Sequence, residues 1–323
     1  MTREMKKILV TGALGQIGSE LTLALREKYG NENVIATDIR ADDKNILSGS
    51  GPFQILDVKD ADAIEEIIKK YNIDSVFHLA AILSGVGEKD PILCWTINMN
   101  GSINILNAAV KFDFARVIIP SSIAVWGPDT PAIAPQSCAL KPTTMYGVTK
   151  VAGEVLTDYY VKKFGLDCRG LRYPGIISSE TFPGGGTTDY AVAIYYDAIK
   201  KGKYECFVKE DTKLPMMYMP DCIKATLDLA EADFDKLVHH NDFNVGSMSF
   251  DVLTLANSIK KILPDFEITY KPDFRQEIAD SWPDGVDDTC AREEWSWDPS
   301  FDLDSMTKDM LERLKIKHEN GEI

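Results

Sequence analysis

The sequence lacks the features that mark membrane, secreted and metal-binding proteins. Its longest apolar runs fall far short of the roughly 18 residues that a membrane-spanning helix needs. The short polar start, residues 1–7, runs directly into an apolar stretch without the pattern of a signal peptide. Six cysteines and four histidines are scattered, with no Cys-x-x-Cys pair and no Cys/His cluster. We therefore expect a cytoplasmic protein with reduced thiols, no metal site and no membrane association.

Positive charge is also scarce. Lysine and arginine number 35 against 50 aspartate and glutamate residues, which gives a formal net charge of −15. Such a surface repels nucleic acids and anionic membranes, so neither is an expected partner. The hydrophobic fraction of 45% and the charged fraction of 26% are those of an ordinary globular protein.

Short apolar runs rich in β-branched residues alternate with helical patterns through the first half of the chain. This alternation predicts an α/β fold of the Rossmann type, a doubly wound parallel sheet covered by helices on both faces. Longer connections follow residue 174, which predicts a smaller C-terminal substrate-binding lobe. The expected strands are 7–11, 34–37, 53–56, 75–79, 116–120 and 167–172, and the expected helices are 16–29, 61–71, 98–112 and 146–164.

A glycine-rich turn, Gly12-x-x-Gly15-x-x-Gly18, follows the first expected strand and opens the first expected helix. Glycine lets the backbone bend sharply and approach a pyrophosphate, which the free N–H groups of the helix start then hold. Asp38 ends the next strand, 20 residues after Gly18, where a carboxylate accepts hydrogen bonds from the adenosine ribose and repels a 2′-phosphate. The combination predicts NAD rather than NADP as the cofactor, with Arg40 as the one residue nearby that favours NADP.

We therefore expect an NAD-binding domain over residues 1–173. A return segment at about 216–247 is expected to rejoin it. The substrate-binding lobe is then made of residues 174–215 and 248–323.

Three Tyr-x-x-x-Lys pairs place a phenol and an ammonium one helical turn apart: Tyr146/Lys150, Tyr159/Lys163 and Tyr196/Lys200. The ammonium, together with the positive charge of oxidised nicotinamide, lowers the phenol pKa so that the phenolate can act as a base. Only Tyr146 begins its helix directly after a proline-bearing loop. An upstream strand ends at Ser121 and Ser122, and ligands of such sheets bind at the carboxyl ends of strands. We therefore expect the catalytic centre at Tyr146 and Lys150, with one of these serines.

These motifs resemble those of the extended short-chain dehydrogenase/reductase family, which combines the longer glycine turn with a Ser…Tyr-x-x-x-Lys centre. The resemblance implies that Ser122 hydrogen-bonds the substrate hydroxyl, that Tyr146 removes its proton, and that Lys150 holds the nicotinamide ribose. Asn98 matches a family position that props the active-site helix, with a helix N-cap as the alternative interpretation. The expected cofactor contacts are Gly12, Gly15, Gln16, Ile17, Gly18, Asp38, Ile39, Asp57, Val58, Leu79, Ala80, Ala81, Asn98, Tyr146, Lys150, Tyr173 and Ile176.

The residues alone leave the substrate open as a secondary alcohol. Segments 183–191 (Pro-Gly-Gly-Gly-Thr-Thr-Asp-Tyr-Ala), 214–221 and 281–283 are similar to those of the short-chain-type L-threonine 3-dehydrogenases. This resemblance implies zinc-independent oxidation of L-threonine to 2-amino-3-oxobutyrate with NAD. It also implies a homodimer, because the helices that match 98–112 and 146–164 pair across a two-fold axis in the family. The expected substrate contacts are Ser84, Ser121, Ser122, Tyr146, Gly186, Thr187, Thr188, Asp189 and Trp282.

Two other functions share this fold. A nucleotide-sugar 4-epimerase or dehydratase has the same Tyr/Lys centre. A dehydratase, however, carries an acid where Ile123 and Ala124 stand, and an epimerase needs basic groups for a diphosphate, which are few between residues 174 and 221. A non-catalytic NAD sensor has no reason to keep an intact catalytic centre. For Asp189 two roles stay open, binding of the substrate ammonium or bracing of the glycine loop.

Overall fold

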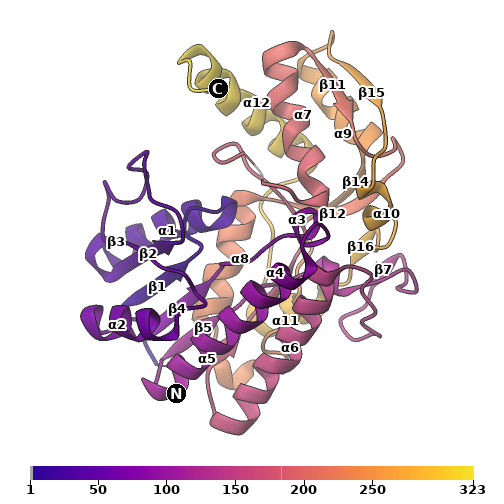
Figure 1. Ribbon diagram of the computed structural model, residues 1–323. Coiled ribbons are helices and arrows are strands. Elements are labelled where there is room, and N and C mark those ends of the chain that lie inside the picture. The colour runs from indigo at the N-terminus through magenta and orange to yellow at the C-terminus, as the bar shows by residue number, and fades with distance from the viewer. Residues whose placement is uncertain (1–2, 183) are drawn as a thin grey trace.

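The computed structural model describes residues 3–182 and 184–323, so Pro183 of the glycine loop lies outside the described residues. Its largest sheet has six parallel strands in the order β3-β2-β1-β4-β5-β8 (Figure 1). This order confirms the predicted Rossmann-type α/β fold. The strands are β1 Ile8–Thr11, β2 Val34–Asp38, β3 Phe53–Ile55, β4 Ser75–His78, β5 Arg116–Ile118 and β8 Cys168–Arg169.

Helices cover both faces of this sheet, as the continuous apolar runs of its strands require (Figure 1). Along β1, Leu9 faces a core shared with α2, α5 and α6, whereas Ile8 and Val10 face a core shared with α1 and α8. No helix in the described part of the chain is both long and apolar enough to cross a membrane. The bounds are α1 Gln16–Tyr29, α2 Ala61–Tyr71, α5 Gly101–Lys111, α6 Met145–Phe164 and α8 Met219–Glu231.

The helix expected over 98–112 begins earlier than predicted, at Pro91. Asp90 caps α4 (Pro91–Trp95) by accepting a hydrogen bond from the Leu93 N–H, and α4 continues through a π-helical turn, Thr96–Asn100, into α5. Asn98 therefore lies inside a continuous helix, and its interpretation as an N-cap is wrong. An aspartate followed by proline at the first helical position is the start signal that the apolar pattern overlooked.

The expected strand 167–172 is split into β8 and β9 (Leu171–Tyr173), and the expected strand 116–120 is shorter than predicted. β5 ends at Ile118, and a separate strand, β6 (Ser121–Ser122), begins after Pro120. A proline cannot continue a strand ladder because it has no N–H group. β9 pairs with β6 on one side and with β13 (Phe243–Asn244) on the other, so the chain returns beside the main sheet at β13.

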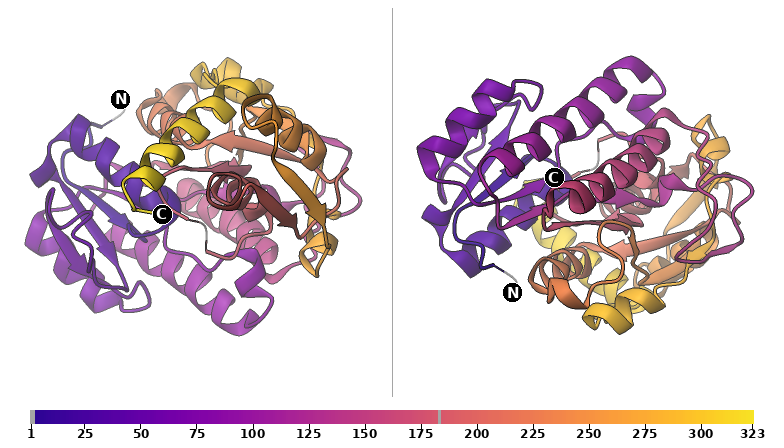
Figure 2. Two further views of the ribbon diagram at one scale, coloured as in Figure 1. Left: turned by 90° about the horizontal axis from the view of Figure 1, so that it is seen from above. Right: turned by 90° about the horizontal axis from the view of Figure 1, so that it is seen from below.

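The C-terminal part of the chain forms a lobe around a core that contains Tyr190, Ile194 and Met216 and extends to Trp126 and Tyr146 of the first half. Figure 2 shows it to one side of the strands β1, β2 and β3. β12 pairs with β10 and β14 of this lobe, and the predicted domain bounds stay a prediction. The elements are β10 Gly175–Ile177, α7 Tyr190–Lys201, β11 Lys203–Cys206, β12 Lys213–Tyr218, β14 Met248–Asp251, α9 Val252–Ile262, β15 Glu267–Tyr270 and α12 Leu303–Glu319.

Candidate active site

A cavity of about 1070 Å³, partly open to solvent, extends from the glycine turn to the C-terminal lobe. Every expected substrate contact lines it: Ser84, Ser121, Ser122, Tyr146, Gly186, Thr187, Thr188, Asp189 and Trp282. Most expected cofactor contacts line it as well: Gly12, Gly15, Gln16, Ile17, Gly18, Leu79, Ala81, Tyr146, Lys150, Tyr173 and Ile176. The fold thus brings together residues from both halves of the chain at the carboxyl ends of the strands.

The remaining expected cofactor contacts lie outside this cavity: Asp38, Ile39, Asp57, Val58, Ala80 and Asn98. Ala80 and Asn98 line a second cavity behind Lys150. The other four lie at or just beyond the ends of β2 and β3, along the same edge of the sheet. Ile39 is exposed there, whereas Val58 is buried. Their contact with the adenosine end of the cofactor stays a prediction.

The glycine turn leaves no space for side chains. A Cβ atom at Gly12, whose φ is +67°, would lie 2.6 Å from the backbone nitrogen of Ala80. A Cβ atom at Gly18 would lie 2.2 Å from the carbonyl oxygen of Gly12. Bare backbone therefore borders the cavity where α1 begins, and this is the surface that a pyrophosphate requires.

Asp38 is held rigidly and neutralises Arg40. Its carboxylate accepts a hydrogen bond from the Leu14 N–H at 3.0 Å and another from the Arg40 Nε at 3.0 Å. The Asp38 side chain is only 6% exposed, against 62% for that of Arg40. Because the guanidinium is already paired, it is not free to act as the isolated cation that a 2′-phosphate needs, and this geometry favours NAD.

His78 directly precedes the expected cofactor contacts Leu79, Ala80 and Ala81 and lines the site with them. It ends β4 and borders both cavities, and its Nδ1 lies 2.7 Å from the Thr11 hydroxyl. Its Nε2 is buried without a hydrogen-bond partner among the described residues. Burial, aided by the positive charge of Lys150, lowers the pKa of His78 to about 3, so the ring is neutral. An unpartnered buried nitrogen beside the glycine turn fits a site for a polar ligand such as NAD.

The predicted catalytic centre is assembled at the start of α6. Thr144 caps this helix by accepting a hydrogen bond from the Gly147 N–H at 3.1 Å, which sets Tyr146 and Lys150 one turn apart. The Lys150 Nζ lies 5.5 Å from the centre of the Tyr146 ring. Ser122, at the end of β6, lines the same cavity as Tyr146, and its hydroxyl lowers the pKa of the Tyr146 phenol. Phenol, ammonium and serine hydroxyl therefore meet in one cavity.

The two other Tyr-x-x-x-Lys pairs lie elsewhere. Tyr159 is 51% exposed on the outer surface of α6. Tyr196 is buried in α7 and donates its hydroxyl hydrogen to the carbonyl oxygen of Ser179. Neither tyrosine borders the active-site cavity.

Burial dominates the acid–base chemistry of the centre. It raises the pKa of Tyr146 to about 12, although the hydrogen bond with Ser122 acts in the opposite direction. It lowers the pKa of Lys150 to about 8, against the effect of the Glu154 carboxylate, which raises it. The Lys150 ammonium donates to the carbonyl oxygen of Pro120 at 2.7 Å. In the protein itself, burial therefore outweighs the expected lowering of the Tyr146 pKa. The positive charge of oxidised nicotinamide must supply that lowering.

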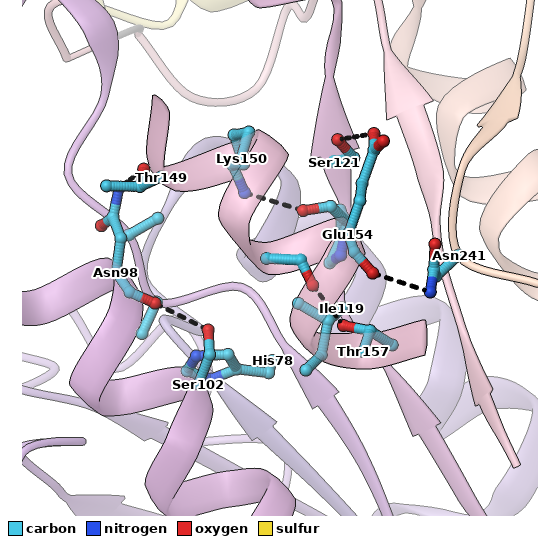
Figure 3. A pocket seen from close by; sticks show the side chains of 14 residues that line it. His78, Asn98, Ser102, Ile119, Ser121, Thr149, Lys150, Glu154, Thr157 and Asn241 are labelled. Carbon is cyan, nitrogen blue, oxygen red and sulfur yellow. Dashed lines mark hydrogen bonds between the residues drawn. The ribbon is translucent and has the colours of Figure 1, made fainter. Parts of the chain in front are cut away.

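Asn98 props the active-site helix directly. Its Nδ2 donates to the Thr149 hydroxyl on α6 at 3.0 Å, and its Oδ1 accepts from the Ile82 N–H at 2.8 Å. Figure 3 shows Asn98 beside Thr149, with Lys150 next along the helix. The propping implied by the family resemblance is thus made by a direct hydrogen bond and needs no water between the two side chains.

Glu154 is a site residue that pattern reasoning missed. It lies one turn after Lys150 on α6 and is 7% exposed. Its carboxylate accepts a hydrogen bond from Ser121 at 2.5 Å and two from Arg172 at 2.8 Å each. Figure 3 shows it joined to Ser121 by a hydrogen bond, in the lining of the second cavity behind Lys150. The available signal was the i, i+4 spacing to Lys150, which puts a negative charge next to the ammonium.

The glycine loop is tied to the rest of the site by two contacts. The hydroxyls of Ser84 and Thr187, both buried, lie 3.1 Å apart. The Asp189 carboxylate accepts hydrogen bonds from the N–H groups of Gly185 at 2.9 Å and Gly186 at 2.8 Å. Two roles were considered for Asp189, and these hydrogen bonds correspond to the bracing of the glycine loop.

A comparison with known protein families identifies the family to which this chain belongs. Residues 8–246 match the NAD dependent epimerase/dehydratase family. The chain belongs to this family. Members of this family are enzymes of the extended short-chain dehydrogenase/reductase type, and NAD is their cofactor.

Proteins of known sequence and structure resemble this family member over nearly its full length. An uncharacterized epimerase/dehydratase of Staphylococcus aureus is 49% identical over 315 residues, which make up 97% of this chain and 98% of its own. The X-ray structure of L-threonine dehydrogenase from Clostridium difficile has 54% identity and a TM-score of 0.95, and the match covers 98% of this chain and 99% of that one. A monomeric L-threonine 3-dehydrogenase from a metagenome has 50% identity and a TM-score of 0.93, with 96% and 99% covered.

Proposed function

We propose that this protein oxidises L-threonine to 2-amino-3-oxobutyrate with NAD. The observation that carries the proposal is the meeting of the Ser122, Tyr146 and Lys150 centre with Thr187 and Thr188 in one cavity. The two similar structures, at 54% and 50% identity, are L-threonine dehydrogenases, which supports this substrate over a nucleotide sugar.

The cavity and the adjoining edge of the sheet offer the groups that NAD requires. The backbone of the Gly12–Gly18 turn would hold the pyrophosphate at the start of α1, Asp38 would accept from the adenosine ribose, and Lys150 would hold the nicotinamide ribose. When bound, NAD supplies the two-electron acceptor, because its nicotinamide ring takes up the hydride that leaves the hydroxyl-bearing carbon of the substrate.

The chain's own side chains orient the substrate hydroxyl and remove its proton. Ser122 and Tyr146 hydrogen-bond this hydroxyl, and the Tyr146 phenolate accepts its proton as the carbonyl forms. Lys150, with a pKa of about 8, is mostly cationic at neutral pH and stabilises the phenolate. Glu154 keeps that cation protonated from one turn away.

The amino-acid part of the substrate fits the far end of the cavity. Ser84, Thr187 and Thr188 present hydroxyls that can donate to a carboxylate, and the Gly186 backbone borders the same space. Trp282 supplies an apolar wall for the methyl group of threonine. These assignments predict that the cavity selects a small amino acid with a hydroxyl on its third carbon.

The decisive test is the formation of NADH with L-threonine, compared with the conversion of UDP-galactose. We expect NADH absorbance with L-threonine and NAD, much weaker absorbance with NADP, and no loss of rate in EDTA. No NADH from L-threonine, together with epimerisation of UDP-galactose, would establish the epimerase alternative instead. Activity lost in EDTA and restored by zinc would contradict the metal-free mechanism.

We also propose a cytoplasmic homodimer. The six cysteines are free, as is usual in the reducing cytoplasm. Val148, Val155 and Tyr159 form an apolar row along α6 and are 40%, 66% and 51% exposed, and Ile92 on α4 is 75% exposed. Contiguous exposed apolar surface is typical of an interface.

Sedimentation tests the homodimer. Val155→Glu puts a charge at the centre of the apolar row, so we expect it to convert dimer to monomer without unfolding the chain. A wild-type chain that sediments as a monomer, as the metagenomic structure is described, would overturn the proposal.

A further inference from the structure

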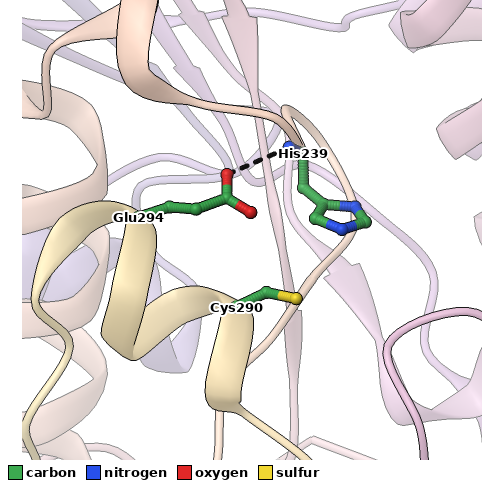
Figure 4. A group of neighbouring side chains, drawn as sticks. All are labelled: His239, Cys290 and Glu294. Carbon is green, nitrogen blue, oxygen red and sulfur yellow. Dashed lines mark hydrogen bonds between the residues drawn. The ribbon is translucent and has the colours of Figure 1, made fainter.

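We propose that His239, Cys290 and Glu294 form a binding site for a divalent transition-metal ion of the zinc type (Figure 4). One ligand atom from each residue lies within 4.8 Å of those of the other two. The three residues lie outside the lining of the active-site cavity. The proposal therefore concerns a separate site and does not depend on the proposed dehydrogenase activity.

Local structure explains why the three side chains converge. Cys290 and Glu294 lie one turn apart on the same face of α11 (Thr289–Trp295). His239 comes from the loop that leads into β13. Figure 4 shows the thiol and the carboxylate on the side of α11 that faces His239. The Glu294 Oε2 accepts hydrogen bonds from the N–H groups of Val238 at 2.6 Å and His239 at 3.1 Å, which leaves Oε1 as a ligand atom.

The two halves of this site are held together by the core beneath it. Trp295 ends α11 and packs edge-on against Phe243 of β13, with ring centres 5.8 Å apart. The imidazole of His239 packs against the same Phe243 ring, also at 5.8 Å. Because this packing already places the donors, metal binding does not have to order the loop and the helix.

The donor set and its surroundings suit a zinc-type ion. Thiolate, imidazole and carboxylate are the ligands that Zn²⁺ and Co²⁺ take in proteins, and three of them leave a position for water. Asp242 lies 3.4 Å from the His239 Nδ1, in the arrangement that orients a histidine ligand and leaves Nε2 for the metal. The carboxylates of Glu294 and Asp242 beside the site attract a cation, and the cation displaces the thiol proton of Cys290 on binding.

Titration of the untagged, reduced full-length protein with Co²⁺ tests the proposal. We expect a thiolate-to-cobalt charge-transfer absorption that saturates at one equivalent and is abolished by Zn²⁺. Cys290→Ser should remove the absorption, and Glu294→Gln should weaken Co²⁺ binding at least tenfold. The matched controls are Cys138→Ser and His318→Asn, which alter another accessible cysteine and histidine and should leave the titration unchanged.

Thermal unfolding provides a second readout. Zn²⁺ should raise the unfolding temperature of the wild type by a few degrees and leave that of Cys290→Ser unchanged, because an ion that binds only the folded state stabilises it. A wild type without the charge-transfer band, or a band that survives in Cys290→Ser, would overturn the proposal. These readouts need neither substrate nor NAD, so a failure of the threonine assay leaves them interpretable.

Discussion

Replacement of Glu154 by glutamine removes one charge from a buried pair while it keeps the size of the side chain. Arg172, 3% exposed, then keeps its hydrogen bonds to the Gln136 carbonyl and the Asn244 amide oxygen but loses its main anion. Removal of one partner from a buried ion pair costs about 3–5 kcal/mol. Asp242 remains at 3.8 Å from Arg172, so we expect the lower end, about 3 kcal/mol of unfolding free energy.

The same substitution should alter the pH dependence of the reaction. Glu154 raises the pKa of Lys150, which burial holds at about 8, so its loss lowers that pKa further. Because Lys150 acts as a cation, the alkaline limb of kcat/KM should move to lower pH in Glu154→Gln. A tenfold weaker affinity of Lys150 for its proton would move that limb by about one pH unit. The variant should therefore lose most activity near pH 8 and little well below neutrality.

The assay is kcat/KM for L-threonine as a function of pH, with urea unfolding of the same samples. Thr157→Val is the matched control. Thr157 lies on the same helix and borders the same cavity, but it carries no charge and loses only its hydroxyl bond to the Gly153 carbonyl. A Glu154→Gln variant that is destabilised yet keeps the wild-type alkaline limb would refute the electrostatic role.

Three further outcomes are expected. Tyr146→Phe should lower kcat by about 10²–10⁴-fold, the usual contribution of a general base, whereas Tyr159→Phe, on the exposed face of α6, should retain full activity. Burial raises the pKa of Glu20 to about 7, so the folded state holds a proton that the unfolded state releases above its ordinary pKa of 4.5. The unfolding free energy of the wild type therefore falls as the pH rises from 4.5 through about 7. At about 1.4 kcal/mol per pH unit, Glu20→Gln should be about 3 kcal/mol more stable than wild type at pH 8 and equally stable at pH 4. Urea unfolding at both pH values tests this, and a difference that does not change with pH would contradict it. Gly185 has φ +109°, and a Cβ atom there would lie 2.9 Å from a valine methyl group. Gly185→Ala should therefore lower kcat/KM for L-threonine about tenfold, through about 1–3 kcal/mol of loop strain, whereas the control Gly184→Ala, which adds a methyl group in open space, should not. Equal rates for the two variants would show that the loop conformation is unimportant.

Short-range patterns in the sequence were sufficient to predict the nucleotide-binding half. The glycine turn, the strand before it and the helix after it lie within one short segment, and their spacing follows from backbone geometry. The same holds for Tyr146 and Lys150, one helical turn apart. Pattern reasoning failed where a local irregularity intervened, as near Pro120, where β5 ends two residues early, and at Asp90, which starts a helix before the apolar periodicity becomes visible.

Which distant residues meet depends on how the folded chain packs. From its motifs the sequence predicted an NAD-binding α/β fold and a catalytic centre at Ser122, Tyr146 and Lys150. It contained no sign that Glu154 would pair with Arg172 behind that lysine, or that Cys290 and Glu294 would face His239. Such contacts join separate strands, helices and loops, so no spacing along the chain encodes them. They arise when hydrophobic cores pack those elements together and bring the polar side chains between them into reach.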